Sequence, residues 1–205
     1  MTMPSLLRCT RASGAAEFAL VLPLLLVFLF GIIDAARLAW DYNRIAKATQ
    51  IGARMAVVTD ILEPAIASQS YVGADPEDDD IVLTQGDRIP QSAFGTIVCS
   101  EDGCECTAGP CPDAGTFNSD AFTALVARMN QIQPDIGSSN VRISYSGSGL
   151  GFAGDPNGMD ISPIVTVSAT GLTFNPLTTL ALVTVNLPDF RTSLTAEDSV
   201  GSQSN

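Results

Sequence analysis

The sequence predicts an α+β protein in which one long N-terminal helix packs on a small, mainly antiparallel β-sheet. Three observations support this fold class. An uncharged apolar run extends from Phe18 to Ile33, and a helical spacing of apolar residues continues from there to about Leu62. Short runs of alternating apolar and polar residues follow in the second half of the chain, as expected of half-buried strands.

The charge is distributed unevenly along the 205 residues, whose formal net charge is -12. From Asp60 onward the chain holds 19 acidic and 4 basic residues, and a surface this negative repels phosphate backbones. We therefore expect no nucleic-acid partner. The chain has no His, which excludes Ser-His-Asp triads, Cys-His dyads and His-ligated metal sites. We expect no enzyme, no cofactor and no metal, although a hydrolase that uses carboxylates alone stays formally open.

The apolar run has the length of a membrane-spanning helix. Counted from Ser13, with Glu17 inside it, the run approaches the ~20 residues that a spanning helix needs. A cleaved secretory signal would have a shorter apolar core and a small-x-small cleavage site after it, whereas here a helical pattern continues. The carboxylate of Glu17 is energetically costly inside an apolar, membrane-spanning run. It either reaches the headgroups or pairs with a cation from a neighbouring chain within the membrane.

The next segment predicts the second half of the same helix. Apolar or small residues recur there at spacings of four and three, which places them on one face: Leu38, Tyr42, Ile45, Ala48, Gly52 and Met55. We expect one helix from about Ser13 to about Leu62, with its first half in lipid and its second half amphipathic. Pro23 removes one backbone hydrogen bond in the lipid half and favours a bend there.

Residues 63–198 predict a separate α+β domain, and residues 199–205 a disordered tail. Strand-like runs occupy residues 80–84, 95–99, 140–146 and 163–171, and the last two should be antiparallel neighbours. A helix is expected near residues 118–133, capped by Asn118 or Ser119. Another strand should end near Leu187, after a short helical turn, and a further one should begin at Phe190. The acidic segments 73–80 and 155–160 read as solvated loops, with calcium binding as the weaker alternative.

Four of the five cysteines crowd into residues 99–111, namely Cys99, Cys104, Cys106 and Cys111. Cys104 and Cys106 are too close in sequence to pair without strain. Two connectivities remain: 99–104 with 106–111, or 99–106 with 104–111. A four-thiolate zinc site is the competing interpretation, but a Cys-x-Cys core does not match the usual Cys-x2-Cys pairs. We expect a disulfide-rich loop, which indicates an oxidising compartment.

The N-terminal segment RASGAAEFALVLPLLLVFLFGIIDAARLAWDYNRIAKATQIGARMAV resembles that of the TadE-like pseudopilins. These are minor pilin-like subunits of the tight-adherence (Flp) branch of bacterial type IV pili. The matching positions are Glu17-Phe18, Pro23, Asp34, Arg37 and Gly52-Ala53-Arg54. The resemblance covers about the first 58 residues. It implies a pilin-like arrangement of the long helix and the sheet.

The resemblance also implies processing by a membrane prepilin peptidase, which cuts family members after a Gly and leaves Glu at the fifth mature position. A cut between Ala12 and Ser13 makes residues 1–12 a leader and Glu17 the fifth mature residue, with Ala12 where the family has Gly. The alternative cut, after Gly14, would make Glu17 the third. In the family, the freed α-amine pairs with the Glu of an adjacent subunit, so Glu17, Phe18 and Pro23 are the expected subunit contacts.

The expected partners are the prepilin peptidase, other pilin-like subunits, the inner-membrane assembly platform and the membrane itself. We expect a single-pass protein of the bacterial inner membrane with its C-terminal domain extracytoplasmic. The count of positive residues does not favour this orientation, but the cysteine cluster does. The alternative interpretation is an uncleaved signal anchor that presents an extracytoplasmic adhesin or an envelope-sensing domain. Incorporation into a pilus and adhesion through it are left open.

Overall fold

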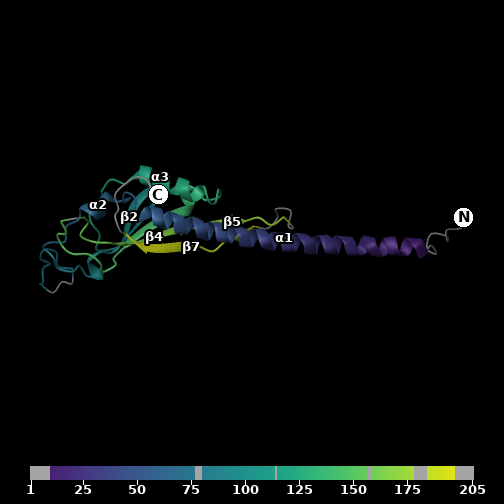
Figure 1. The fold of residues 1–205 in the computed structure, drawn as a ribbon, viewed down its shortest axis with the longest axis horizontal. Helices are drawn as coiled ribbons and strands as arrows, with labels where there is room; N and C mark the ends of the chain where they lie inside the picture. Colours follow the sequence, from purple (N-terminus) through teal and green to yellow (C-terminus); the bar gives the residue numbers. More distant parts are fainter. Residues whose placement is uncertain (1–9, 77–79, 114, 157, 178–183, 197–205) are drawn as a thin grey trace. The chain divides into compact units, whose positions relative to one another are not determined.

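The structure is a computed structural model that describes residues 10–76, 80–113, 115–156, 158–177 and 184–196 (Figure 1). The described residues form two compact units. The helical unit contains the chain up to Asp41 together with Thr173–Asn186, and the sheet unit contains Tyr42–Leu172 and the chain from Leu187 onward. The predicted tail 199–205 lies outside the described residues, as do residues 1–9 of the expected leader.

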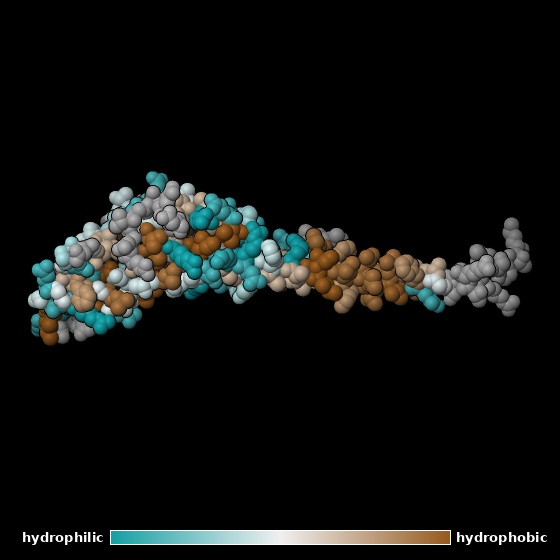
Figure 2. All heavy atoms as spheres, in the orientation of Figure 1, coloured by the Kyte–Doolittle hydropathy of each residue, from teal (hydrophilic) through white to brown (hydrophobic). Residues whose placement is uncertain are grey.

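Helix α1 extends from Thr10 to Ala56 and continues through Pro23 without interruption. In the helical unit, every described side chain from Gly14 to Ile33 is exposed. This helix is long and apolar enough to cross a membrane, as judged by length and composition from Gly14 onward. Figure 2 shows the apolar residues as a continuous hydrophobic surface along this part of α1. The predicted long helix is confirmed, and its first half is a candidate membrane anchor.

The helix ends at Ala56, six residues before the predicted boundary. The N–H and the hydroxyl group of Thr59 both donate to the carbonyl oxygen of Met55, at 3.0 and 2.8 Å. Both bonds satisfy the Met55 carbonyl of the last turn: the first has the i→i−4 spacing of the helix itself, and the hydroxyl group adds a second donor. Ile61 and Leu62 are buried, so their apolar character serves the core rather than a longer helix.

The sheet unit contains a five-stranded sheet in the order β2-β1-β3-β4-β7. All four neighbouring pairs are antiparallel, as predicted for the fold class. The strands are β1 (Thr96–Ser100), β2 (Gly103–Ala108), β3 (Val141–Ser146), β4 (Ile164–Ala169) and β7 (Phe190–Thr195). The predicted pairing of the runs 140–146 and 163–171 is confirmed as β3 against β4.

One face of this sheet is apolar and buried, and the other is polar. The buried face carries alternate residues of the central strands, which are Val141, Ile143, Tyr145, Val165, Val167 and Ala169. The second half of α1 and helix α3 (Ser119–Asn130) contribute Ile45, Ala48, Phe122, Leu125 and Met129 to the same core. Asn118 caps α3 by accepting a bond from Ala121 N–H at 3.0 Å, as predicted.

The remaining elements are short. Helix α2 spans Pro64–Ser68, and the 3-10 helices η2 and η3 span Gln91–Ala93 and Ser138–Asn140. In the helical unit, strands β5 (Thr173–Phe174) and β6 (Val185–Asn186) pair with each other. The short helical turn expected between Asn175 and Val185 falls largely on residues 178–183, outside the described part of the chain.

Two local predictions are wrong. Residues 80–84 form no strand. Ile81 and Val82 are 67% and 53% exposed, and Leu83 exchanges backbone hydrogen bonds with Gly73 and Ala74 outside any strand. The cysteine-rich segment is not purely a loop. Residues 103–108 pair with β1 as strand β2, through a turn in which Gly103 has a φ of 130°.

Candidate functional site

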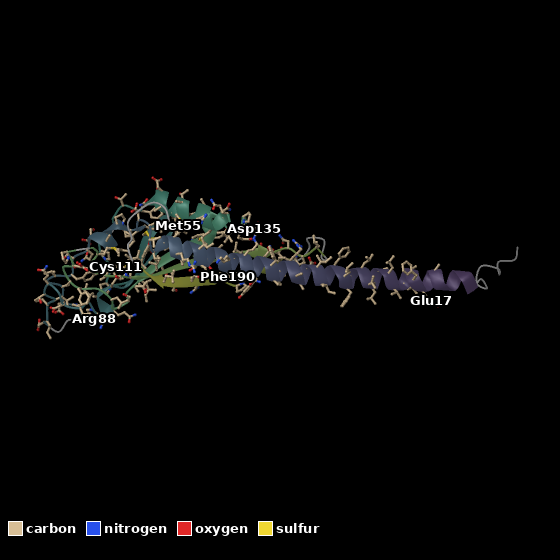
Figure 3. The ribbon with its side chains drawn as sticks, viewed as in Figure 1. Glu17, Met55, Arg88, Cys111, Asp135 and Phe190 are labelled. Atoms are coloured by element: carbon tan, nitrogen blue, oxygen red, sulfur yellow. A yellow bond between two sulfur atoms is a disulfide. The ribbon has the colours of Figure 1, made fainter. Side chains whose placement is uncertain are left out.

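Glu17 lies in the N-terminal part of α1, where Figure 3 labels it, and its side chain is exposed. Phe18 beside it is 65% exposed, and Pro23, less than two turns further on, is also exposed. The structure therefore presents the three expected subunit contacts on the surface of one helix. Ala12, Ser13 and Gly14 lie in the first turns of the same helix, so both candidate cuts fall within its backbone.

The apolar side chains around Glu17 have the exposure of a membrane or assembly surface. Leu20, Leu24 and Phe28 are 79%, 73% and 70% exposed. A helix that is apolar on all sides is stable only in an apolar environment that surrounds it. Within the described residues, the chain itself buries none of the most apolar window of α1. This exposed apolar surface is consistent with a membrane anchor.

The apolar run ends at a polar cluster that fixes the β5–β6 segment to α1, which we call the Asp34 latch (Asp34, Arg37, Phe174, Asn175 and Leu177). The Asp34 carboxylate accepts the N–H of Leu177 at 2.8 Å and the guanidinium group of Arg37 at 3.1 Å. Asp34 is only 7% exposed. The guanidinium carbon of Arg37 lies 5.2 Å from the ring centroid of Phe174, within cation–π range. Arg37 also donates to the carbonyl of Asn175 at 3.5 Å.

Gly52 allows α1 to approach both α3 and the sheet. A Cβ at this position would lie 2.8 Å from Sδ of Met129 and 3.2 Å from Cγ1 of Val167. Such distances are shorter than ordinary packing contacts, so only Gly fits without displacement of its neighbours. The adjacent Ala53 is fully buried, whereas Arg54 is exposed. The helix therefore packs against its own domain through Gly52 and Ala53, whereas Arg54 faces away from this contact.

Arg44 is a half-buried cation in the second half of α1. Its guanidinium group donates through Nε, at 2.8 Å, and through a terminal nitrogen to the carbonyl oxygen of Ile132. Ile132 follows the C-terminal end of α3, where unpaired carbonyl groups and the helix dipole favour a cation. The second half of α1 therefore contacts the C-terminal end of α3 through a charged hydrogen-bond donor as well as through apolar packing.

Both disulfides lie at the β1–β2 hairpin and have the first of the two predicted connectivities, Cys99–Cys104 and Cys106–Cys111. Cys99 and Cys104 are cross-strand partners of β1 and β2. Cys106–Cys111 joins β2 to the segment that follows it. Each bridge closes a short loop, so together they constrain an edge of the sheet that contributes few buried side chains.

The buried carboxylate of Asp160 in the sheet unit has a structural role. Among the described residues there is no group of three or more carboxylates and cysteines placed to hold a metal ion. Asp160 accepts the N–H groups of Tyr71 and Asp155 at 2.8 and 3.1 Å. Burial, and secondarily the charge of Asp160, raises the pKa of Tyr71 to about 12. Tyr71 is thus a neutral phenol at physiological pH.

Tyr145 and Glu63 join the segment after α1 to the sheet. Burial raises the pKa of Tyr145 above its usual range, and the nearby Glu63 adds to this effect. Its phenol oxygen accepts the N–H of Leu62 at 3.2 Å. The Glu63 carboxylate caps α2 at Ala65 N–H and accepts the N–H of Gly115 at 2.9 Å. These contacts indicate structural roles for both side chains.

The Asp34 latch is the feature of the functional region that the sequence did not predict. In the sequence, Asp34 and Arg37 stand out only as positions that match the family pattern. Their spacing of three residues permits a helical ion pair. No sequence signal connects Asp34 with Leu177, which lies 143 residues away.

Comparison with known proteins supports the resemblance in the N-terminal segment. Residues 12–54 match the sequence model of the family described as TadE-like protein. No curated protein and no solved structure matches the chain. The matched residues include Glu17, the apolar run, the Asp34–Arg37 pair and Gly52. Over residues 12–54 the chain is therefore similar to TadE-like proteins.

Proposed function

We propose that the protein is a non-enzymatic pseudopilin of the tight-adherence pilus system, made as a precursor, cut between Ala12 and Ser13, and held in the bacterial inner membrane with its sheet unit outside. The TadE-like family suggests involvement in this system. The observation that carries the proposal is the exposed apolar surface of α1 from Gly14 to Ile33, which needs an environment beyond this chain.

In the proposed assembly, Glu17 pairs with the new α-amine of an adjacent subunit. Each charge alone is costly in an apolar environment, whereas a paired ammonium and carboxylate compensate one another. The side chain of Glu17 is exposed on α1, as a contact with a second chain requires. Phe18 and Pro23 lie in the same part of the helix and would pack against that neighbour. The disulfides support an oxidising compartment for the sheet unit.

A complementation experiment tests this role of Glu17. Pili sheared from a deletion strain of the source bacterium are quantified after expression of Glu17→Ala, Glu17→Gln or the unaltered chain. Both variants should lose assembly, because neither side chain compensates the α-amine. Glu101→Ala is the matched control, since Glu101 is an exposed carboxylate of the sheet unit and its replacement should leave assembly intact.

Sequencing of the mature N-terminus tests the processing step separately. The proposal expects Ser13 as the first residue in pilus-competent cells. An N-terminus upstream of Ser13, together with normal assembly by Glu17→Ala, would favour the alternative of an uncleaved signal anchor. A start at Ala15 would place the cut after Gly14 instead.

A further inference from the structure

We propose that the exposed side of the second half of α1 docks the β1–β2 hairpin of a second copy of this chain. Lys47 and Arg54 on the helix would meet Asp102 and Glu105 on the hairpin. This inference rests on the proposed function, because assembly is what brings subunits together. It adds a contact between neighbouring sheet units to the contact that the proposed function assigns to Glu17.

The exposed side of this half of α1 is polar and basic. From Asn43 to Ala56 the exposed residues follow spacings of four and three, which place them on one face of the helix, and they are Asn43, Lys47, Gln50 and Arg54. We call this face the basic stripe. Residues 42–59 contain no acidic residue. The helix dipole favours a cation at Arg54, in the last turn of α1, but gives no reason for Lys47 about two turns earlier.

The basic stripe receives no counter-charge from its own chain. Among the described residues, no ion pair involves Lys47 or Arg54. The domain that follows is strongly acidic, since the chain from Asp60 onward holds 19 acidic and 4 basic residues. A basic helix face and an acidic domain on one chain make two copies complementary where the helix of one meets the domain of the other. A second copy is therefore the occupant that the charges favour.

The β1–β2 hairpin is the acidic surface whose spacing fits the basic stripe. Asp102 in its turn and Glu105 on β2 are exposed, and neither forms an ion pair within the described part of the chain. Three positions separate them, which is about 10 Å of extended chain. Seven positions separate Lys47 from Arg54, which is also about 10 Å of helix. Two cations thus match two carboxylates, and Glu101 of the same turn has no counterpart.

The hairpin has the rigidity and the position of a docking surface. Cys99–Cys104 joins its two strands beside the turn, and Cys106–Cys111 joins β2 to the following segment. A surface that is already held in one conformation loses little conformational entropy when it binds. Because β2 is an edge strand of the sheet, another chain can approach it from the side.

Anionic lipid headgroups are the other source of negative charge for the basic stripe. Lys47 follows Ile33, the last residue of the apolar run, by 14 residues of α1, which is about 21 Å at 1.5 Å per residue. The attraction of an anionic membrane surface falls off within about 10 Å at physiological salt. This separation favours a protein surface over a lipid surface.

Carbodiimide crosslinking tests the contact, because the reagent joins an amine to a carboxylate that touches it. Lys47 is the only lysine, so the α-amine is the only other primary amine of the chain. Full chains purified from membranes, as an equal mixture of ¹⁵N-labelled and unlabelled protein, are reconstituted in phosphatidylcholine vesicles and treated with a water-soluble carbodiimide. Mass spectrometry should find amide links of mixed isotope composition from Lys47 to Asp102 or Glu105.

Charge reversal checks that the ion pairs hold the two copies together. Arg54→Glu should lower the yield of the mixed-isotope link by about fivefold or more, since a repulsion replaces an attraction. Combining it with Glu105→Arg should restore the link from Lys47 to Asp102. Arg88→Glu is the matched control, because Arg88 is an exposed arginine outside the basic stripe, and it should leave the yield unchanged.

A second reagent separates this contact from the proposed function. Dicyclohexylcarbodiimide enters the bilayer, where it should join the α-amine of one chain to Glu17 of another if the proposed function holds. If this link forms but Lys47 gives no mixed-isotope link to the hairpin, the present inference alone fails. If neither link forms, both fail.

Two further results would overturn the docking contact. A Lys47 link to a carboxylate outside the hairpin, or a link only within one copy, would contradict the assigned partner surface. Loss of the link when phosphatidylglycerol replaces half of the phosphatidylcholine would show that lipid headgroups occupy the basic stripe instead.

Discussion

The two halves of α1 differ in which parts of their surface are exposed. From Gly14 to Ile33 every described side chain is exposed, whereas from Ile45 to Ala56 the buried residues follow a spacing of three and four along one stripe. An amphipathic stripe is typical of a helix that packs on its own domain, and an all-round apolar surface of one that is enclosed by something else. One continuous helix therefore serves two environments, and its sequence changes character at the Asp34 latch.

The largest expected effect comes from the removal of one apolar side chain in each half of α1. Ile45 is 1% exposed in the core of the sheet unit, so Ile45→Ala should lower the free energy of unfolding by about 2–5 kcal/mol. Leu24 is 73% exposed, and Leu24→Ala should change it by less than about 0.5 kcal/mol. Denaturant unfolding of both variants in one detergent measures the two values. Similar losses would mean that the halves do not differ as described.

Alkaline pH should weaken the sheet unit while it leaves the first half of α1 helical. The pKa of Tyr71 is raised to about 12 and that of Tyr145 is raised further above the usual value, so both stay protonated in the folded state after they ionise in the unfolded state. Stability is then lost as pH rises above about 10, by about 1.4 kcal/mol per pH unit for each tyrosine. For Tyr71 this loss ends near pH 12.

The pH dependence is measured as unfolding free energy against pH in the same detergent. Tyr71→Phe should reduce the slope above pH 10, because one of the two ionisations is removed. A stability that does not fall between pH 10 and pH 12 would contradict the burial of these phenols.

A smaller effect is expected from a methyl group added to each half. Gly52→Ala forces a Cβ against Met129 and Val167, a cost of about 1–3 kcal/mol that the better helix propensity of Ala offsets by about 1 kcal/mol. The net loss should be of the order of 1 kcal/mol. Gly31→Ala is the control, because no atom beyond the neighbouring helix backbone lies within 4 Å of its Cβ position, and it should not destabilise the sheet unit. A thermal unfolding midpoint raised by Gly52→Ala would show that α1 is not closely packed there.

The sequence predicts those elements whose pattern depends only on residues close together in the chain. Alternation in residues 140–146 and 163–171, a capping Asn118 and an uncharged run of apolar residues each depend on neighbours within a few positions. Strand β2 was missed because Gly103–Ala108 is mostly exposed and has no apolar alternation. Its place in the sheet comes from pairing with β1 rather than from burial.

The functional region was predictable only in part. Glu17 and the apolar run could be recognised from charge, length and family pattern, but the latch depends on a backbone N–H of Leu177 that no residue type reveals. The choice between the two disulfide connectivities also required the register of β1 on β2. Long-range pairings of this kind depend on tertiary structure, so spacing alone does not specify them.

The thermal unfolding of a shortened chain tests the central claim most directly, namely that the partners of the apolar half of α1 lie outside this chain. A chain that begins at Asp34 keeps the latch, the second half of α1 and the sheet unit. It should be soluble without detergent and should unfold within about 2 °C of the full chain, the shift that about 0.5 kcal/mol causes at this size. A chain that aggregates, or whose midpoint falls far below that of the full chain, would show that the first half of α1 stabilises the domain and would contradict the account.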